Sequence, residues 1–89
     1  MKNMFSIYGN ICGDRVRLGR AMHKPPLSQK ALAMKLQFLG LDNITESMLS
    51  RIEKGERHVI DLELKLIAKA LNVSIDWLVG DTEDPSRRE

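Results

Sequence analysis

Two short amphipathic helices in close succession, within residues 27–57, constrain the fold of this chain more than any other feature. Ser28 is a good N-cap for the first of them, because its hydroxyl can accept a hydrogen bond from a free backbone amide. Leu32, Leu36 and Leu39 then recur at spacings of four and three residues, which places them along one apolar stripe. We therefore predict a helix that begins directly after Ser28 and buries one face.

The second of these helices is predicted at about residues 45–54. Thr45 can cap its first turn, and Ile44 and Leu49 have the spacing of a hydrophobic staple. Leu49 and Ile52 then face the core, which leaves an outward polar face rich in hydrogen-bond donors: Glu46, Ser47, Ser50, Arg51 and Lys54. Two helices arranged in this way are typical of a helix-turn-helix, whose second helix lies in the major groove of DNA.

The rest of the chain predicts a single all-α domain. Its 89 residues suffice for one small core, aromatic residues make up only 4%, and no run of alternating β-branched residues suggests a sheet. A helix at about residues 10–22 would end at the Lys-Pro-Pro of residues 24–26, although Gly13 and Gly19 would weaken it. Residues 1–9 are predicted to form a flexible arm.

Two further helices are predicted after the central pair. The first has Asp61 as its cap and runs to Leu71, and the second is a short helix capped by Ser74. The chain after this last helix is polar and contains proline, which predicts a frayed tail over residues 80–89. The expected architecture is therefore five helices in one domain over residues 10–79.

Cysteine content and hydropathy indicate a protein of a reducing compartment. Cys12 is the only cysteine, so the chain cannot form an internal disulfide. No stretch is long and apolar enough to span a bilayer, and the first residues lack the apolar core and cleavage site of a signal peptide. We therefore expect a cytoplasmic protein without membrane contact.

The charge of the chain is distributed unevenly, although the net charge is only +2. Residues 1–58 carry ten Lys and Arg against five Asp and Glu, whereas residues 59–89 carry four against seven. A basic first part and an acidic last part would turn the first part toward phosphates. Small helical domains often have uneven charge, however, so this pattern has modest weight.

Three segments resemble the Cro/repressor-type helix-turn-helix proteins of phages and bacteria, also called the XRE family. The first is Ser28-Gln29 followed by Leu32-Ala33, and the second is Leu49-Ser50-Arg51-Ile52-Glu53-Lys54-Gly55. The third, at residues 66–78, is Leu-Ile-Ala-Lys-Ala-Leu-Asn-Val-Ser-Ile-Asp-Trp-Leu. The resemblance covers about residues 11–79 and implies a compact, lambda-repressor-like domain of five helices.

The resemblance also implies which residues contact the DNA backbone. Gln29 matches the family's glutamine that hydrogen-bonds a phosphate, at a helix N-terminus whose free amides and dipole attract an anion. Lys54 and Arg57 match the helix end and following loop, where phosphates are usually met. Glu53 matches a residue that tends to pair with an arginine of the first helix, here best matched by Arg20. We interpret that pair as part of the scaffold.

Base contacts are implied for the outward face of the second helix. Glu46, Ser47 and Arg51 match positions that face base edges, and Ser50 lies on the same polar face. Arg51 could bind guanine O6 and N7, while Ser47 could donate or accept. Glu46 could accept a hydrogen bond from cytosine N4, or could simply be a favourable charge at a helix N-terminus. Outside this motif, Arg51 and Lys54 would be read as ordinary solvated charges.

One departure from the family pattern concerns the connection between the two helices. The family's turn is usually compact, whereas residues 37–43 look like an added helical turn and a wider loop. This longer connection could change how the second helix meets the groove.

These observations favour a sequence-specific, double-stranded DNA-binding transcriptional regulator, of repressor type. It would bind an inverted repeat as a homodimer through its C-terminal helices, with Leu62 and Leu66, or the Leu78-Val79 end, as candidate contacts. The alternative is a protein-interaction module that keeps the fold without DNA binding, for which Glu46 and the acidic last third are the best arguments. An enzyme is the weakest alternative, because the chain shows no nucleophile and base pair and no metal-ligand cluster. We expect no cofactor and no metal.

Overall fold

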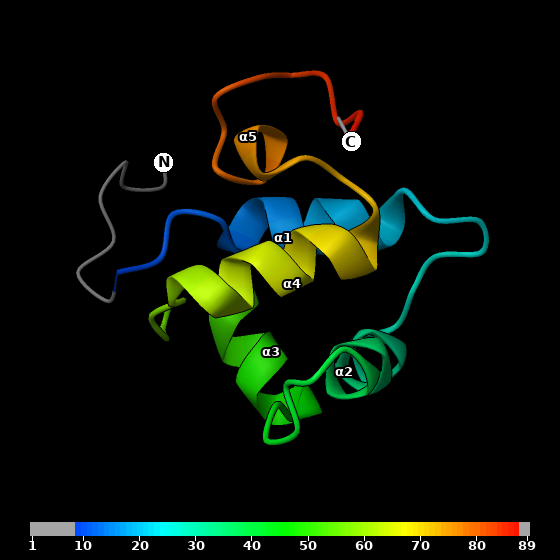
Figure 1. The fold of residues 1–89 in the computed structure, drawn as a ribbon, viewed down its shortest axis with the longest axis vertical. Coiled ribbons are helices and arrows are strands. Elements are labelled where there is room, and N and C mark those ends of the chain that lie inside the picture. The colour runs from blue at the N-terminus through cyan, green and yellow to red at the C-terminus, as the bar shows by residue number, and fades with distance from the viewer. Residues whose placement is uncertain (1–8, 88–89) are drawn as a thin grey trace.

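The computed structural model describes residues 9–87, and within that range it contains five helices and no strand (Figure 1). The helices are α1 (Gly13–Ala21), α2 (Gln29–Phe38), α3 (Glu46–Glu53), α4 (Asp61–Leu71) and α5 (Ile75–Leu78). The prediction of an all-α domain of five helices is confirmed. Residues 1–8 of the expected N-terminal arm and residues 88–89 of the expected tail lie outside the described residues.

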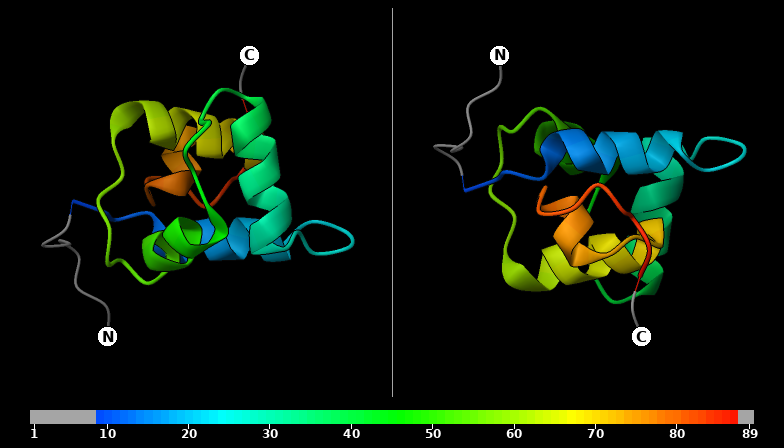
Figure 2. Two further views of the ribbon diagram at one scale, coloured as in Figure 1. Left: turned by 90° about the horizontal axis from the view of Figure 1, so that it is seen from below. Right: turned by 90° about the horizontal axis from the view of Figure 1, so that it is seen from above.

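The core lies where α4 crosses the domain. α4 contacts α1, α2 and α5, and α3 packs against α1 and α2 (Figure 2). Each of the five helices places at least one side chain in the core that is 0% exposed: Val16, Leu36, Leu49, Ile67 and Leu78. Leu78 was a candidate dimer contact, and that expectation was wrong because its side chain is used within the monomer. None of the helices in residues 9–87 is long and apolar enough to cross a bilayer.

Three of the four predicted N-caps are confirmed. The hydroxyls of Ser28, Thr45 and Ser74 accept hydrogen bonds from backbone amides three residues ahead, at 2.9, 3.1 and 3.0 Å. The prediction of Asp61 as a cap was wrong, because the cap position of α4 is Ile60. An apolar residue suffices there because the carboxylate of Glu63 accepts the N–H of Ile60 at 3.2 Å.

α1 begins three residues later than the sequence predicts, because Asn10 is occupied by tertiary contacts. Its Oδ1 accepts the N–H of Cys12 at 2.9 Å, which makes a turn immediately before the helix. Its Nδ2 donates to the carbonyl oxygens of Ile52, at 2.7 Å, and Arg57, at 3.0 Å. Asn10 therefore ties the start of α1 to the end of α3 and the loop beyond it.

The two glycines of α1 allow the helix to lie close to its neighbours. A Cβ added at Gly13 would lie 2.4 Å from the carbonyl oxygen of Ile52 in α3. A Cβ added at Gly19 would lie 2.9 Å from Cδ1 of Leu71 in α4. At Gly13 the neighbouring atom is backbone, so a larger residue would prevent the close approach, whereas at Gly19 the neighbouring atom is the end of a side chain.

Residues 81–87 turn back over α5 and are called here the C-terminal strap (Figure 1). The carbonyl oxygen of Pro85 accepts the N–H of Ser74 at 3.0 Å, and Nη1 of Arg87 donates to the carbonyl oxygen of Val73 at 2.9 Å. Arg15 of α1 holds the strap from the other side, with Nη2 3.0 Å from a carboxylate oxygen of Glu83. The prediction of a frayed tail was wrong for the strap, because the carbonyl of Pro85 and the guanidinium of Arg87 bond to backbone groups left open between α4 and α5.

The connection between α2 and α3 is ordered. Nε2 of Gln37 donates to the carbonyl oxygen of Ile44 at 2.8 Å, which fastens the connection to α2. Ile44 is buried and Leu41 is half-buried, so the connection contributes to the core. Gly40 has a φ of +116°, which favours glycine at this helix end.

Candidate nucleic-acid interface

α3 has two chemically different faces. Leu49 and Ile52 are 0% exposed and anchor it in the core. The opposite face carries four exposed residues and the half-buried Ser50; the exposed ones are Glu46, Ser47, Arg51 and Lys54. The structure thus brings five of the seven predicted site residues together, four within α3 and Lys54 at its C-cap.

Both ends of α3 are defined by local hydrogen bonds. The N-terminal end has the Thr45 cap, and the predicted staple partners Ile44 and Leu49 are both buried. At the other end Gly55 has a φ of +75°, and its N–H donates to the carbonyl oxygen of Ile52 at 3.0 Å. The N–H of Glu56 donates to the carbonyl oxygen of Arg51 at 2.9 Å, which completes a Schellman motif. The helix therefore presents a short polar surface of fixed length.

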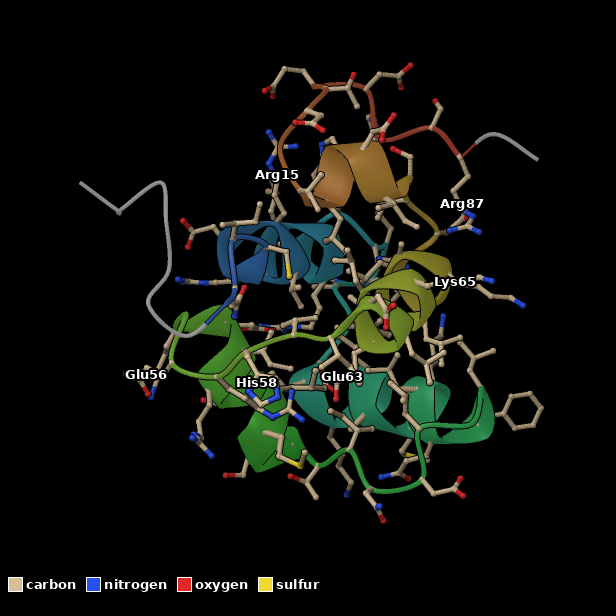
Figure 3. All side chains as sticks on the ribbon, turned by 60° about the vertical axis from the view of Figure 1, so that its left-hand side comes forward. Arg15, Glu56, His58, Glu63, Lys65 and Arg87 are labelled. Atoms are coloured by element: carbon tan, nitrogen blue, oxygen red, sulfur yellow. The ribbon has the colours of Figure 1, made fainter. Side chains whose placement is uncertain are left out.

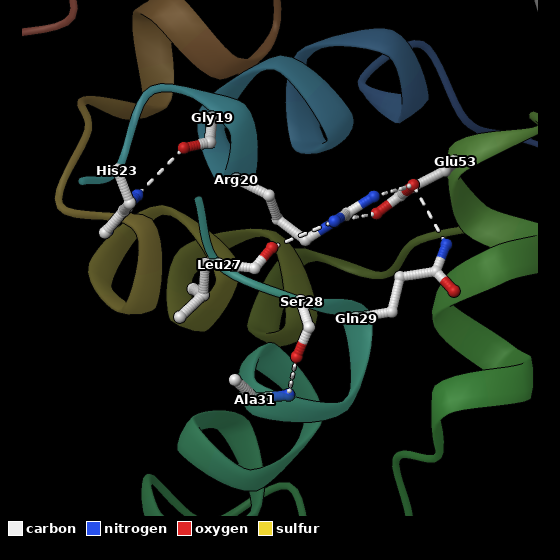
Figure 4. Close-up of polar contacts among 8 residues, drawn as sticks. All are labelled: Gly19, Arg20, His23, Leu27, Ser28, Gln29, Ala31 and Glu53. Atoms are coloured by element: carbon white, nitrogen blue, oxygen red, sulfur yellow. Dashed lines mark hydrogen bonds and ion pairs between the residues drawn. The ribbon is translucent and has the colours of Figure 1, made fainter. Parts of the chain in front are cut away.

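The predicted scaffold pair of Arg20 and Glu53 is confirmed and links three elements (Figure 4). Nε and Nη2 of Arg20 donate to the two carboxylate oxygens of Glu53 at 2.6 and 2.7 Å. Nη1 of Arg20 donates to the carbonyl oxygen of Leu27 at 2.9 Å, directly before α2. The hydrogen bonds that Arg20 donates to Glu53 raise the pKa of Arg20 above its ordinary value. The pair therefore fixes the end of α3 against α1 and against the start of α2.

Gln29 joins the same cluster, which the sequence did not predict. Its Nε2 donates to Oε1 of Glu53 at 3.1 Å (Figure 4). A side-chain amide has two N–H donors, so one remains for a second partner. Gln29 is half-buried at the first position of α2. Within residues 9–87, the only backbone N–H of this first turn with a partner is that of Ala31, which donates to the hydroxyl of Ser28. The arrangement leaves several donors at one helix N-terminus.

Arg57 differs from these residues, because its guanidinium is paired with a carboxylate outside the cluster. Nη1 and Nη2 donate to the carboxylate oxygens of Glu63 at 3.1 and 2.9 Å, and Nη1 also donates to the carbonyl oxygen of His58 at 3.0 Å. Figure 3 labels Glu63, in the first turn of α4, and His58, in the loop before α4. Burial alone would raise the pKa of Glu63, but the hydrogen bonds from Arg57 and the Ile60 amide lower it below its ordinary value. Nothing in the sequence pattern distinguishes this pairing from a solvated arginine.

Other reactive groups give no second site in the described chain. Burial raises the pKa of the Cys12 thiol to about 11, so the thiol is protonated and unreactive at neutral pH. Within residues 9–87 no three His, Cys, Asp or Glu side chains lie close enough together to hold a metal ion.

Comparison with known protein families gives a match over more than half of the chain. A helix-turn-helix family model matches residues 27–78, which run from just before α2 to the end of α5. No curated protein and no solved structure matches the chain. The match includes both helices of the predicted motif and every predicted site residue.

Proposed function

This chain belongs to the XRE-type helix-turn-helix family of DNA-binding transcription regulators, and we propose that it acts as a repressor that inserts α3 into the major groove. The observation that supports this most directly is the exposed polar face of α3. Ser47, Arg51 and Lys54 are exposed there, and within residues 9–87 no ion pair involves Arg51 or Lys54. Their side chains are therefore free to bind a ligand.

Each position of this face suits a particular DNA group. Arg51 can bind O6 and N7 of guanine in a bidentate manner, and Ser47 can donate to or accept from a base edge. Glu46 can only accept, for example from cytosine N4, and it would repel a nearby phosphate. Gln29 has a spare amide donor at the N-terminus of α2, and Lys54 adds a positive charge at the end of α3, so these two would bind phosphates.

Arg57 would contribute less than the other positions. Its guanidinium would have to leave the carboxylate of Glu63 before it could bind a phosphate, which would leave a largely buried charge unpaired. Residues 10–79 form the DNA-binding domain in this proposal.

We also propose that the protein binds an inverted repeat as a homodimer, with half-sites about one helical turn apart. Leu62 of α4 is 53% exposed and Leu66 is half-buried, so both remain candidates for the dimer contact. A symmetric dimer would place two copies of α3 on one face of the duplex.

The proposal is tested by selecting duplexes from a randomised pool with the wild-type chain and with Arg51→Ala. The wild type should select a two-fold symmetric sequence, and Arg51→Ala should lose discrimination at one base pair in each half-site, worth about 1–3 kcal/mol. Lys65→Gln, on the outer face of α4, is the control and should select the wild-type sequence (Figure 3).

The competing function, a protein-interaction module, has one structural argument. Met34 and Phe38 lie one turn apart on α2 and are 60% and 91% exposed, which is unusual for large apolar side chains. This function requires no affinity for duplex DNA. Absence of binding by the wild type even at low salt would therefore contradict the repressor proposal and favour this one.

A further inference from the structure

One stripe of α1 lies against the C-terminal end of α3. At Gly13 the backbone approaches so closely that an added Cβ would lie 2.4 Å from the carbonyl oxygen of Ile52 and 3.0 Å from that of Glu53. Arg20, two turns further along α1, binds the carboxylate of Glu53. Residues seven apart share one face of a helix, so these contacts define the side of α1 that is turned toward α3.

Arg17 lies on the same stripe, four residues after Gly13 and three before Arg20. It is exposed, and within residues 9–87 no ion pair or hydrogen bond holds its guanidinium. The carboxylate on that side, Glu53, has both oxygens occupied by Arg20 and one of them shared with Gln29. The positive charge of Arg17 is therefore not neutralised by the part of the chain that the structure describes.

The other two arginines of α1 differ from Arg17 in this respect. Arg20 is paired with Glu53, and Arg15 lies 4.7 Å from the ring centroid of Trp77 and pairs with Glu83 of the C-terminal strap. Both therefore act within the fold.

The position of Arg17 relative to the candidate interface follows from the packing of the helices. In the left view of Figure 2, α1, α3 and the start of α2 lie along the same edge of the domain. Gln29, at the start of α2, shares the carboxylate of Glu53 with Arg20, which lies one turn from Arg17. The N-terminus of α2 and the exposed side of α1 therefore lie on the same edge of the domain.

We propose that Arg17 is a further DNA-binding residue, whose guanidinium contacts a backbone phosphate next to the one bound at the N-terminus of α2. This proposal rests on the proposed function, because it requires α3 to lie in the major groove. A guanidinium suits the task, since its parallel N–H groups can bind two phosphate oxygens at once. The contact positions the protein on DNA and carries no sequence information.

The test is the salt dependence of duplex binding, measured by fluorescence anisotropy with the full chain. The wild type, Arg17→Gln and Lys65→Gln are each titrated with the selected duplex and with a scrambled duplex. Loss of one phosphate contact should make the slope of log K against log salt less steep by about 0.9 for Arg17→Gln. Its affinity for both duplexes should fall by the same factor, whereas Arg17→Lys should keep most of the slope.

Lys65→Gln removes the same charge from the outer face of α4 and should leave the wild-type slope unchanged. The proposal would be overturned if Arg17→Gln kept the wild-type slope. It would also be overturned if Lys65→Gln reduced the slope by the same amount, because this would indicate a general effect of net charge. If the wild type binds no duplex, the proposed function fails as well. Thermal unfolding of each variant verifies that the fold is intact.

Discussion

The substitution Gly13→Ala tests how closely α1 and α3 approach each other. Helix propensity alone predicts that it stabilises the protein, by at most about 1 kcal/mol, because glycine is the poorer helix former. The structure predicts the opposite sign. The new Cβ would lie 2.4 Å from the carbonyl oxygen of Ile52, whereas ordinary contacts begin at 3.4 Å, and a backbone atom cannot rotate away. One of the two helices would have to move.

The cost follows from typical values for overpacked cores. Inserting a methyl group into a well-packed site costs about 1–3 kcal/mol, and a clash with backbone belongs at the upper end. After subtraction of the gain in propensity, we expect Gly13→Ala to lower the free energy of unfolding by about 2 kcal/mol. With a urea m-value of roughly 1 kcal/mol/M for a small domain, the midpoint should fall by about 2 M.

Gly19→Ala, in the same helix, is the matched control. Its Cβ would lie 2.9 Å from the end of the flexible side chain of Leu71, which can shift by changing rotamer. The gain in propensity then offsets most of the clash, and stability should change by less than about 1 kcal/mol. Urea unfolding followed by circular dichroism measures both variants. A Gly13→Ala protein as stable as Gly19→Ala would refute the close approach of α1 to α3.

Two further predictions concern carboxylates. Glu53→Ala leaves Arg20 and Gln29 without their shared acceptor. The free energy of unfolding, measured by urea unfolding, should therefore fall by about 3 kcal/mol. A loss below about 1 kcal/mol would mean that the cluster contributes little to stability. Glu63 has a pKa below its ordinary value in the folded protein. Its carboxylate therefore contributes its full stabilisation above the unfolded-state pKa of about 4.3. This stabilisation is lost as the pH falls through the folded-state pKa. Glu63→Gln should therefore show a smaller decrease of stability below about pH 4 than the wild type, and parallel acid-unfolding curves would contradict this assignment.

Features set by a few neighbouring residues were predicted correctly from the sequence. Ser28, Thr45 and Ser74 cap their helices because a cap needs only the amides two or three residues ahead. The apolar stripes also gave the buried faces of α2 and α3, since periodicity reports which side of a helix avoids water. Glu53 and Arg20 could be paired only through the resemblance to a family.

Features that depend on distant parts of the chain were missed. Asn10 was placed inside a helix because its partners, the carbonyl groups of Ile52 and Arg57, are more than 40 positions away. The pairing of Arg57 with Glu63 was not predicted, because nothing in the sequence pattern shows that Glu63 turns toward Arg57. The C-terminal strap looked like a solvated tail, since its polar composition does not reveal the backbone groups that it covers.

The division of α3 into two faces has a consequence for how the proposed recognition surface can diverge. The buried face, with Leu49, Ile52 and Glu53, makes the contacts that hold the helix in place. The exposed face makes no contact that the fold requires, so replacing Ser47 or Arg51 should change stability by no more than about 0.5 kcal/mol. Under the proposed function, binding preference and folding are therefore separable properties of one eight-residue helix. A library randomised on its outer face would sample new targets without first having to be screened for folded members.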